Sequence, residues 1–330
     1  MRLNPQTEQV WFDGQWTTLS QASIPINAHC PNYASLVFEG IRAYPAGIWL
    51  LRQHLERLVE SAAAYRLGRP TMAEVPELMV VAQELLARNQ RQVAYLRPVV
   101  WRDINPESNS GLKVYPKSVA TKMAMVCEPW GQYVPTGKVG SATVLMSNWN
   151  RPWRTMMPGL VKGGASYAPA TLARLDGEDA GADEVLLGGL APDGRRFVLD
   201  GSGQNLIIVR RNQVWTPDAI RWNILFGKTL RFFLYHLQPS DQLRWQFADL
   251  TIEDLITADE VLLVGTASEV VSVGHILVSD DDGSLIKHCI GSGQPGSTYL
   301  AMREIFDRAI SGEDPAYAEF LTPHVQEIVL

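Results

Sequence analysis

The hydrophobic pattern of the chain changes character near residue 142, and this change constrains the fold more than any other feature. Before it, stretches at 51–67 and 72–88 repeat apolar residues at the three-to-four spacing of an amphipathic helix. After it come short β-branched runs separated by turns, which lie at 184–187, 196–199, 205–209 and 260–264. Because 330 residues can bury two moderate cores, the pattern predicts two domains.

The first part of the chain combines its two predicted helices with predicted strands. The Asp13-Gly14 pair within residues 10–16 is typical of a hairpin turn. Further strands are expected at 36–44, 93–101 and 118–127. We therefore expect a smaller α+β domain over residues 1–129. Pro and Gly residues in 130–139 indicate an interdomain linker.

The second part, residues 140–330, predicts a larger domain. Helices are expected at 165–175 and 229–237, between the short β-branched runs. Antiparallel strands with interspersed helices are typical of an α+β or barrel-like domain.

Composition excludes several classes of protein. The net charge of −6 is mild and the basic residues are scattered, so we expect no nucleic-acid partner. The start has no apolar signal core and the chain has no apolar span of membrane length, which predicts a soluble, cytoplasmic protein without a membrane contact. Cys30, Cys127 and Cys289 lie far apart, without the spacing of a metal site or a disulfide framework. We interpret them as free thiols.

Two residues suggest a pyridoxal phosphate enzyme. Lys162 stands among glycines and small residues in 159–164, where glycine allows the backbone to approach a cofactor aldehyde. Asp200, followed by Gly201, offers a carboxylate that can keep a pyridine nitrogen protonated and so make the ring an electron sink. Neither residue is decisive alone, because a surface lysine and an Asp-Gly turn are common.

Several separated segments extend this interpretation. They are Asn32-Tyr33-Ala34-Ser35-Leu36-Val37-Phe38-Glu39-Gly40-Ile41-Arg42-Ala43-Tyr44, His54-Leu55-Glu56-Arg57-Leu58, Tyr95-Leu96-Arg97-Pro98, Pro129-Trp130-Gly131, Ser147-Asn148-Trp149-Asn150-Arg151-Pro152, Lys162, 200–206, 224–229 and 258–273. Together they span about residues 8–305 and resemble the branched-chain aminotransferase family, the class IV or fold-type IV pyridoxal phosphate enzymes. The resemblance implies an α+β, two-domain fold-type IV enzyme with pyridoxal 5'-phosphate as cofactor.

The resemblance also implies roles around the cofactor ring. Lys162 would form the covalent link to the cofactor aldehyde and then, as a freed amine, move a proton between the substrate α-carbon and the cofactor C4′. Asp200 would pair with the pyridine nitrogen N1. Tyr167 would hydrogen-bond the phenolate oxygen.

The cofactor phosphate needs cations and amide donors, because a dianion is costly to bury unpaired. By resemblance, Arg57 would bind phosphate oxygens. Thr229, preceded by Lys228 at a predicted helix start, would add hydroxyl and amide donors. Thr266 and Ala267 match a turn that donates to the phosphate and to the substrate carboxylate. A surface position for Arg57 and an ordinary turn at 265–268 stay open as alternatives.

The substrate residues are also implied by resemblance. Tyr33, Tyr95 and Arg97 match residues around the substrate carboxylate. Phe38, Trp130 and Tyr133 would line an apolar side-chain pocket. Since aromatic residues also pack in cores, a purely structural role stays open, above all for Phe38 and Tyr133.

The chain departs from the family pattern at five positions. Aspartate replaces glutamate at Asp200, and Gln204 replaces a second glutamate, which lowers the negative charge near the ring. Lys228 replaces an apolar residue and either adds charge to the phosphate or points into solvent. Leu230 replaces an arginine and Ser166 an asparagine. These departures predict a specialised member of the family, with an altered substrate or slower turnover.

The resulting hypothesis is an aminotransferase that moves an amino group between an aliphatic or other hydrophobic L-amino acid and a 2-oxo acid. By resemblance, the active site lies between two domains and is completed across a dimer interface, so a homodimer or a higher homo-oligomer is expected. The same fold also carries D-amino acid and amine transaminases and aminodeoxychorismate lyase. A catalytically inactive pyridoxal phosphate-fold binding protein is the alternative of a different class.

Overall fold

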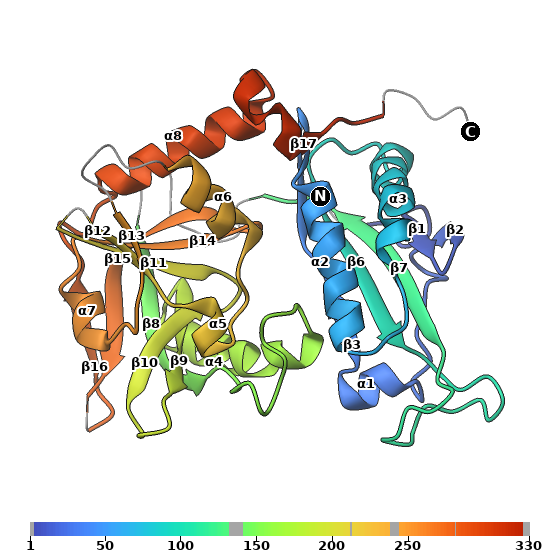
Figure 1. Ribbon diagram of the computed structural model, residues 1–330, viewed down its shortest axis with the longest axis horizontal. Coiled ribbons are helices and arrows are strands. Elements are labelled where there is room, and N and C mark those ends of the chain that lie inside the picture. The colour runs from blue at the N-terminus through green and yellow to red at the C-terminus, as the bar shows by residue number, and fades with distance from the viewer. Residues whose placement is uncertain (1–2, 132–140, 212, 238–243, 281, 326–330) are drawn as a thin grey trace. The chain divides into compact units, whose positions relative to one another are not determined.

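The computed structural model describes residues 3–131, 141–211, 213–237, 244–280 and 282–325 (Figure 1). The chain forms two compact units. Unit 1 comprises Met1–Gly131, Val161–Ala165 and Arg308–Leu330, and unit 2 comprises Gln132–Leu160 and Ser166–Asp307. The domain boundaries and the linker expected from the sequence stay predictions, and most of that linker lies outside the described residues.

Unit 1 is built on an antiparallel sheet. Its strands are β1 (Gln9–Phe12), β2 (Gln15–Thr18), β3 (Leu36–Phe38), β4 (Ile41–Tyr44), β5 (Gly47–Trp49), β6 (Ala94–Arg102), β7 (Thr121–Glu128) and β17 (Leu321–Thr322). In the described part of the chain, their order is β17-β5-β4-β6-β7-β1-β2, with β3 also paired to β6. The chain therefore returns at its C-terminal end to add β17 beside β5.

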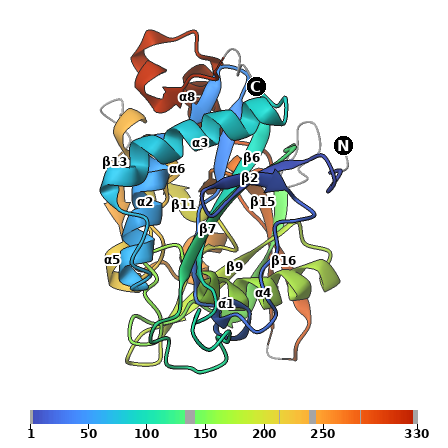
Figure 2. The ribbon, with the colours of Figure 1, turned by 90° about the vertical axis from the view of Figure 1, so that its right-hand side faces the viewer.

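Helices cover one face of this sheet (Figures 1 and 2). They are α2 (Leu51–Ala64) and α3 (Val75–Arg88), the second preceded by a 3-10 turn at Met72–Glu74; a short α1 (His29–Tyr33) precedes β3. Their apolar stripes join the sheet in one buried cluster that includes Leu55, Leu58, Leu85, Val100 and Met123. Both helices predicted from three-to-four periodicity are thus confirmed, because that spacing gathers the apolar side chains on one face.

The predicted hairpin at 10–16 is also confirmed. Trp11 pairs with Trp16 across the two strands. Asp13 and Gly14 form the turn with positive φ angles of 49° and 93°. Positive φ at both central residues gives the turn a twist that matches the strands.

The prediction of one continuous strand over 36–44 is wrong. The strand breaks at Glu39 and Gly40 into β3 and β4, both of which pair with β6. A Cβ atom on Gly40 would overlap the Tyr95 hydroxyl. The Glu39 carboxylate meanwhile turns into the interior to meet Arg57. A close side-chain approach and a buried ion pair thus override the local β pattern.

Unit 2 contains a closed ring of strands. Its strands are β8 (Ala142–Asn150), β9 (Glu184–Leu190), β10 (Arg196–Gly201), β11 (Asn205–Arg210), β12 (Gln213–Thr216), β13 (Arg244–Phe247), β14 (Glu260–Gly265), β15 (Glu269–Ser279) and β16 (Leu285–Cys289). Among the described residues, the path β10-β9-β8-β15-β14-β11 closes because β10 also pairs with β11. Val144, Leu186, Leu206 and Leu263 belong to the buried cluster of these strands. The predicted barrel-like domain is confirmed.

The helices of unit 2 are short, and several follow strand ends. They are α4 (Ala168–Asp179), which follows a 3-10 turn at Gly164–Tyr167, α5 (Ala219–Trp222), α6 (Lys228–His236), α7 (Ile252–Ile256) and most of α8 (Ser297–Ser311), after which a 3-10 turn (Pro315–Phe320) belongs to unit 1. The helices predicted near 165–175 and 229–237 correspond to α4 and α6. Within the described ranges, no helix has the length and apolarity to cross a membrane, and no cluster of side chains is suited to hold a metal ion.

Candidate active site

Lys162 lies on a loop that is fixed to unit 1 through its backbone. Its carbonyl accepts the Phe38 amide at 3.1 Å, and its own amide donates to Ser61 Oγ on α2 at 3.0 Å. The next residue, Gly163, forms a bridge with Val37 of β3. A Cβ atom on Gly163 would overlap the Tyr65 ring. The glycine noticed in the sequence is therefore required by close packing of the loop.

The structure brings Lys162 together with four of the predicted substrate residues. Lys162 Nζ lies 5.1 Å from the centroid of the Phe38 ring, and Arg97 Cζ lies 4.5 Å from the same centroid. Arg97 is also 5.3 Å from the Tyr95 ring, which stacks on Trp130 at a centroid distance of 4.3 Å. An amine, a guanidinium and aromatic faces thus share one region of unit 1. Such a set can bind a carboxylate and an apolar chain.

Two other predicted substrate residues are not part of this group. The Tyr33 hydroxyl donates to the Leu112 carbonyl at 2.6 Å, and its ring lies 4.7 Å from His29. In the described part of the chain, these contacts join α1 to the loop at 112, and the role of Tyr33 in substrate binding stays a prediction. Tyr133 lies outside the described residues.

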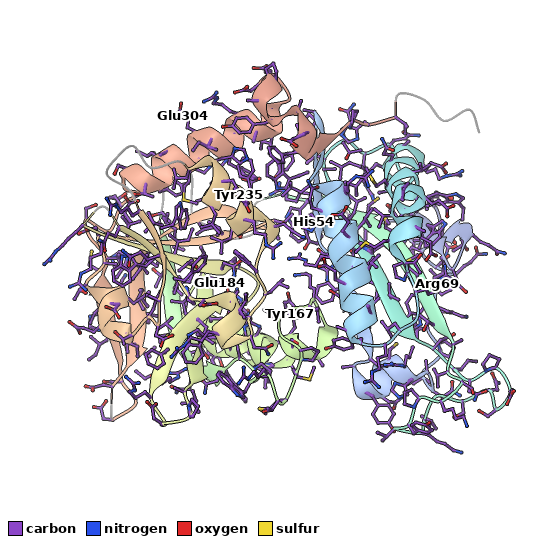
Figure 3. The ribbon with its side chains drawn as sticks, in the orientation of Figure 1. His54, Arg69, Tyr167, Glu184, Tyr235 and Glu304 are labelled. Atoms are coloured by element: carbon purple, nitrogen blue, oxygen red, sulfur yellow. The ribbon has the colours of Figure 1, made fainter. Side chains whose placement is uncertain are left out.

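Arg57 is held on α2 by a buried acid. Glu39 Oε1 accepts Arg57 Nε at 2.5 Å, and Oε2 accepts Nη2 at 2.8 Å. His54 Nδ1 lies 2.8 Å from Glu39 Oε2, and Figure 3 shows His54 on the same helix. Burial alone would raise the pKa of Glu39, but Arg57 and His54 outweigh it and hold that pKa well below its usual range. Glu39 is therefore ionised at neutral pH.

Asp200 lies in unit 2 where β10 meets β11, opposite Asn205. The pairing of β10 with β9 shifts register between Val198 and Asp200, and such irregularities redirect side chains. Arg151 Nε donates to Asp200 Oδ1 at 2.7 Å. Burial raises the pKa of Asp200, and the neighbouring guanidinium only partly opposes this effect. Asp200 thus has the fixed, buried position that a partner for a ring nitrogen requires.

The other nitrogens of Arg151 bind backbone carbonyls. They donate to the carbonyls of Gly201 at 2.6 Å, Ser202 at 3.0 Å and Ser166 at 3.3 Å. Arg151 Cζ also lies 5.9 Å from the centroid of the Tyr167 ring. Tyr167 directly precedes α4 (Figure 3). Arg151 therefore links Asp200 to Tyr167, two residues predicted to contact the cofactor ring.

Gln204 is buried against another acid. Its amide nitrogen donates to Glu184 Oε2 at 2.7 Å. Glu184 Oε1 accepts the Val185 amide at 2.9 Å and Arg174 Nη1 at 3.3 Å. A carboxylate in place of Gln204 would face Glu184 in a buried site, where like charges are unfavourable. The departure from the family glutamate thus fits its surroundings.

The start of α6 forms a cradle with the turn after β14. Thr229 Oγ1 lies 3.4 Å from Thr266 Oγ1, and the Thr229 side chain is buried. The Gly227 amide, just before the helix, donates to Asn205 Oδ1 at 2.9 Å, and a Cβ atom on Gly227 would overlap that oxygen. Two hydroxyls beside a helix N-terminus are suited to an anion such as phosphate. Leu230, at the position of the family arginine, is packed in the interior.

Sequence reasoning assigned no role to Glu39, Arg151 or Glu184. Glu39 and Arg151 stand inside segments that carried the resemblance, and Glu184 begins a β-branched run. A charged residue within an apolar strand pattern needs a buried partner, and this signal was present for Glu39 and Glu184. The partners themselves are distant along the chain.

Comparison with known proteins agrees with this arrangement. Residues 36–276 match the family model described as Amino-transferase class IV. A branched-chain-amino-acid aminotransferase of Salmonella typhimurium (strain LT2) is 27% identical over 93% of this chain and 94% of its own length. A probable branched-chain-amino-acid aminotransferase of Aquifex aeolicus is 28% identical, with 95% and 96% covered.

Solved structures confirm the fold-type IV architecture expected from the resemblance. The branched-chain aminotransferase of Thermoproteus uzoniensis with norvaline has a TM-score of 0.82 and 28% identity, covering 96% of this chain and 99% of that one. A branched-chain amino acid aminotransferase complexed with N-(5'-phosphopyridoxyl)-L-glutamate, from the source abbreviated T.th., has a TM-score of 0.80 and 28% identity, covering 98% and 100%. Because the family model spans most of the chain and carries both Lys162 and Asp200, this protein belongs to the class IV aminotransferases.

Proposed function

We propose that this protein is a pyridoxal 5'-phosphate-dependent aminotransferase that moves an amino group between an aliphatic L-amino acid and a 2-oxo acid. The observation that carries the proposal is the placement of Lys162. Its amine lies 5.1 Å from the Phe38 ring, which Arg97 also contacts, on a loop held by Phe38 and Ser61. An amine fixed beside a carboxylate-binding guanidinium is the arrangement that proton transfer at an amino acid α-carbon needs.

The residues of unit 2 fit this cofactor. Thr229, Thr266 and the N-terminus of α6 supply hydroxyl and amide donors for a phosphate. The buried Asp200 carboxylate would pair with the ring nitrogen. Among the described residues, the buried Ser166 Oγ has no hydrogen-bond partner, so a polar ligand atom beside it would satisfy an otherwise costly group.

When bound, pyridoxal phosphate supplies an aldehyde that takes up the amino group and a ring that accepts electrons from the α-carbon. Lys162 would accept the proton leaving that carbon and later return it. Arg97 and Tyr95 would orient the substrate carboxylate, with Tyr33 and Ala267 contributing to the same end. Tyr167 would hydrogen-bond the phenolate oxygen, and Arg57 and Lys228 would add positive charge near the phosphate.

The substrate class rests on the aromatic residues and on the relatives. Phe38 and Trp130 offer apolar faces beside Arg97 and Tyr95, which suits an aliphatic amino acid. Solved relatives contain norvaline and 4-methylvaleric acid, both short aliphatic carboxylates. The specialised substrate expected from the departures at Asp200, Gln204 and Leu230 is part of this proposal.

We also infer a homodimer or a higher homo-oligomer. Ile26, Val114 and Tyr115 expose large apolar side chains, with exposed fractions of 87%, 73% and 73%. The hydrogen bond from Tyr33 to Leu112 ties α1 to the loop that carries two of them. Apolar surface of this kind favours a protein partner, and a second copy is the one expected from the family.

Absorption spectra of the protein with added pyridoxal phosphate test the proposal. Titration with L-leucine, L-glutamate and D-alanine should change the cofactor spectrum with the L-amino acids only, and produce one equivalent of 2-oxo acid. Lys162→Ala should abolish the change. Release of pyruvate without an amino acceptor would indicate the lyase instead. A cofactor spectrum that no amino compound changes would contradict transamination.

A further inference from the structure

The orientation of Arg57 is set by one carboxylate. Glu39 engages the Nε and Nη2 edge of the guanidinium with both of its oxygens, at 2.5 Å and 2.8 Å. A bidentate contact of this kind fixes the plane of a guanidinium, which a single hydrogen bond would leave free to turn. Nη1 takes no part in the contact with Glu39.

Glu39 is in turn fixed by two further donors. His54 Nδ1 lies 2.8 Å from Oε2, and the Gly40 amide donates to the same oxygen at 3.3 Å. Both Glu39 and His54 have 0% exposed surface. Because its two cationic neighbours outweigh burial and keep the pKa of Glu39 low, the acid is ionised and accepts. His54 Nδ1 must therefore carry the proton.

The position of Glu39 in the chain connects it to the rest of the candidate site. Its neighbour Phe38 contacts Lys162 and Arg97, and its other neighbour Gly40 packs against Tyr95. The break between β3 and β4 is what turns Glu39 away from both and toward α2. A buried ion pair adds little to stability compared with an apolar pair of similar volume, so its presence here calls for another reason.

We propose that Glu39 is a positioning residue which, together with His54, orients the Arg57 guanidinium to bind the phosphate of the cofactor. This inference rests on the proposed function, since it takes pyridoxal phosphate as the ligand. Glu39 neutralises the charge of Arg57, so the phosphate gains from fixed donor directions more than from net charge. Loss of Glu39 should therefore weaken recognition of the phosphate group specifically.

The test compares two forms of the cofactor. Dissociation constants for pyridoxal phosphate and for pyridoxal, which lacks the phosphate, are measured by tryptophan fluorescence on the full chain freed of cofactor. Glu39→Gln should weaken pyridoxal phosphate binding by about tenfold to a hundredfold, as loss of groups that orient ligating side chains commonly does. Binding of pyridoxal should change little. Arg57→Ala should give the same pattern, and the double variant should lose no more than Arg57→Ala alone.

Two further sets of variants separate positioning from folding. Glu8→Gln removes another buried acid of unit 1, which pairs with Arg91, and should leave the ratio of the two constants unchanged. His54→Ala should reduce the preference for pyridoxal phosphate over pyridoxal, whereas His54→Asn, which keeps a donor near the Nδ1 position, should restore it. The His54 variants carry the test if circular dichroism shows that Glu39→Gln is unfolded.

The outcomes are distinguishable. A selective loss for pyridoxal phosphate in Glu39→Gln or His54→Ala, with recovery in His54→Asn, supports the inference. An equal loss for both compounds, or an unchanged ratio in the folded variants, overturns it and makes the cluster purely structural. Failure of the unaltered protein to bind pyridoxal phosphate would overturn the proposed function first, and this inference with it.

Discussion

Arg151 Nε donates to Asp200 Oδ1 at 2.7 Å, so the acid predicted to face the cofactor ring is already paired with a buried guanidinium. Arg151 also binds the carbonyls of Gly201 and Ser202, which join β10 to β11. The acid is thus held from its side chain and from its own hairpin. One side-chain oxygen is engaged by Arg151, and Oδ2 lies outside that contact. This relationship lets a short aspartate occupy a rigid position where the family has glutamate.

Asp200→Asn tests the role of this charge. We expect turnover to fall about a hundredfold with the fold intact, because an amide cannot stabilise a protonated ring nitrogen as a carboxylate does. Steady-state rates with L-leucine and a 2-oxo acid measure the effect. Asp249→Asn, which alters an acid bound to Trp222 elsewhere in unit 2, is the matched control and should retain the rate. An Asp200→Asn variant as active as the original would remove Asp200 from the mechanism.

Gln204→Glu tests the pairing with Glu184. We expect the free energy of unfolding to fall by about 1–3 kcal/mol at neutral pH, since the amide donor to Glu184 is lost and a buried acceptor is left unsatisfied. The loss should shrink as the pH falls, when one of the two carboxyls takes up a proton. Urea unfolding at several pH values measures it. Gln246→Glu on the strand β13 should show no such pH dependence. Equal stability of the Gln204 variant at neutral pH would contradict the expectation.

Gly163→Ala tests the packing of the lysine loop. The added methyl would overlap the Tyr65 ring, and we expect a stability loss of about 1–3 kcal/mol together with lower turnover, since the neighbouring Lys162 must shift. Thermal unfolding and initial rates report the two effects. Gly131→Ala adds the same methyl where nothing lies within 4 Å, and should change neither. If both variants behaved alike, the close approach would have no consequence for catalysis.

Glu39→Gln has a predicted pH signature in stability. The pKa of Glu39 is held below its usual value of 4.5, so its ionised form stabilises the fold above that pH, and this contribution is lost as the pH falls toward the lower folded-state pKa. At neutral pH we expect the variant to lose about 3–5 kcal/mol, the usual result of removing one partner from a buried pair. The difference from the original protein should narrow below about pH 4.5 in thermal unfolding curves. A difference that stayed constant with pH would indicate that Glu39 is not charged in the folded protein.

Much of the fold could be predicted because its signals are local. The apolar repeat of α2 and α3, the Asp13-Gly14 turn and the short runs that became β9, β10, β11 and β14 each depend on residues close together in the chain. The strands β8 and β15, which complete the ring, and the helix α8 were not singled out. Their place follows from pairings such as β8 with β15, which join segments more than a hundred residues apart.

The residue types of the candidate site could also be predicted, but their partners could not. Lys162, Asp200, Arg57 and Thr229 were identified from their segments. Nothing within a few residues of Arg57 indicated Glu39, since the two meet only after the strand breaks at Gly40. The predicted roles of these residues await the experiments above.

The sequence by itself determined the helices, the hairpin, the barrel-like second part and the chemical groups available for catalysis, because periodicity, turn chemistry and residue type act over a few neighbouring positions. Only the tertiary structure decided that Glu39 holds Arg57, that Arg151 holds Asp200, and that Gln204 faces Glu184. Each of these contacts joins residues 18 to 49 positions apart inside a low-dielectric interior. There a buried charge or polar group is stable only beside its partner, and strand register and packing choose that partner.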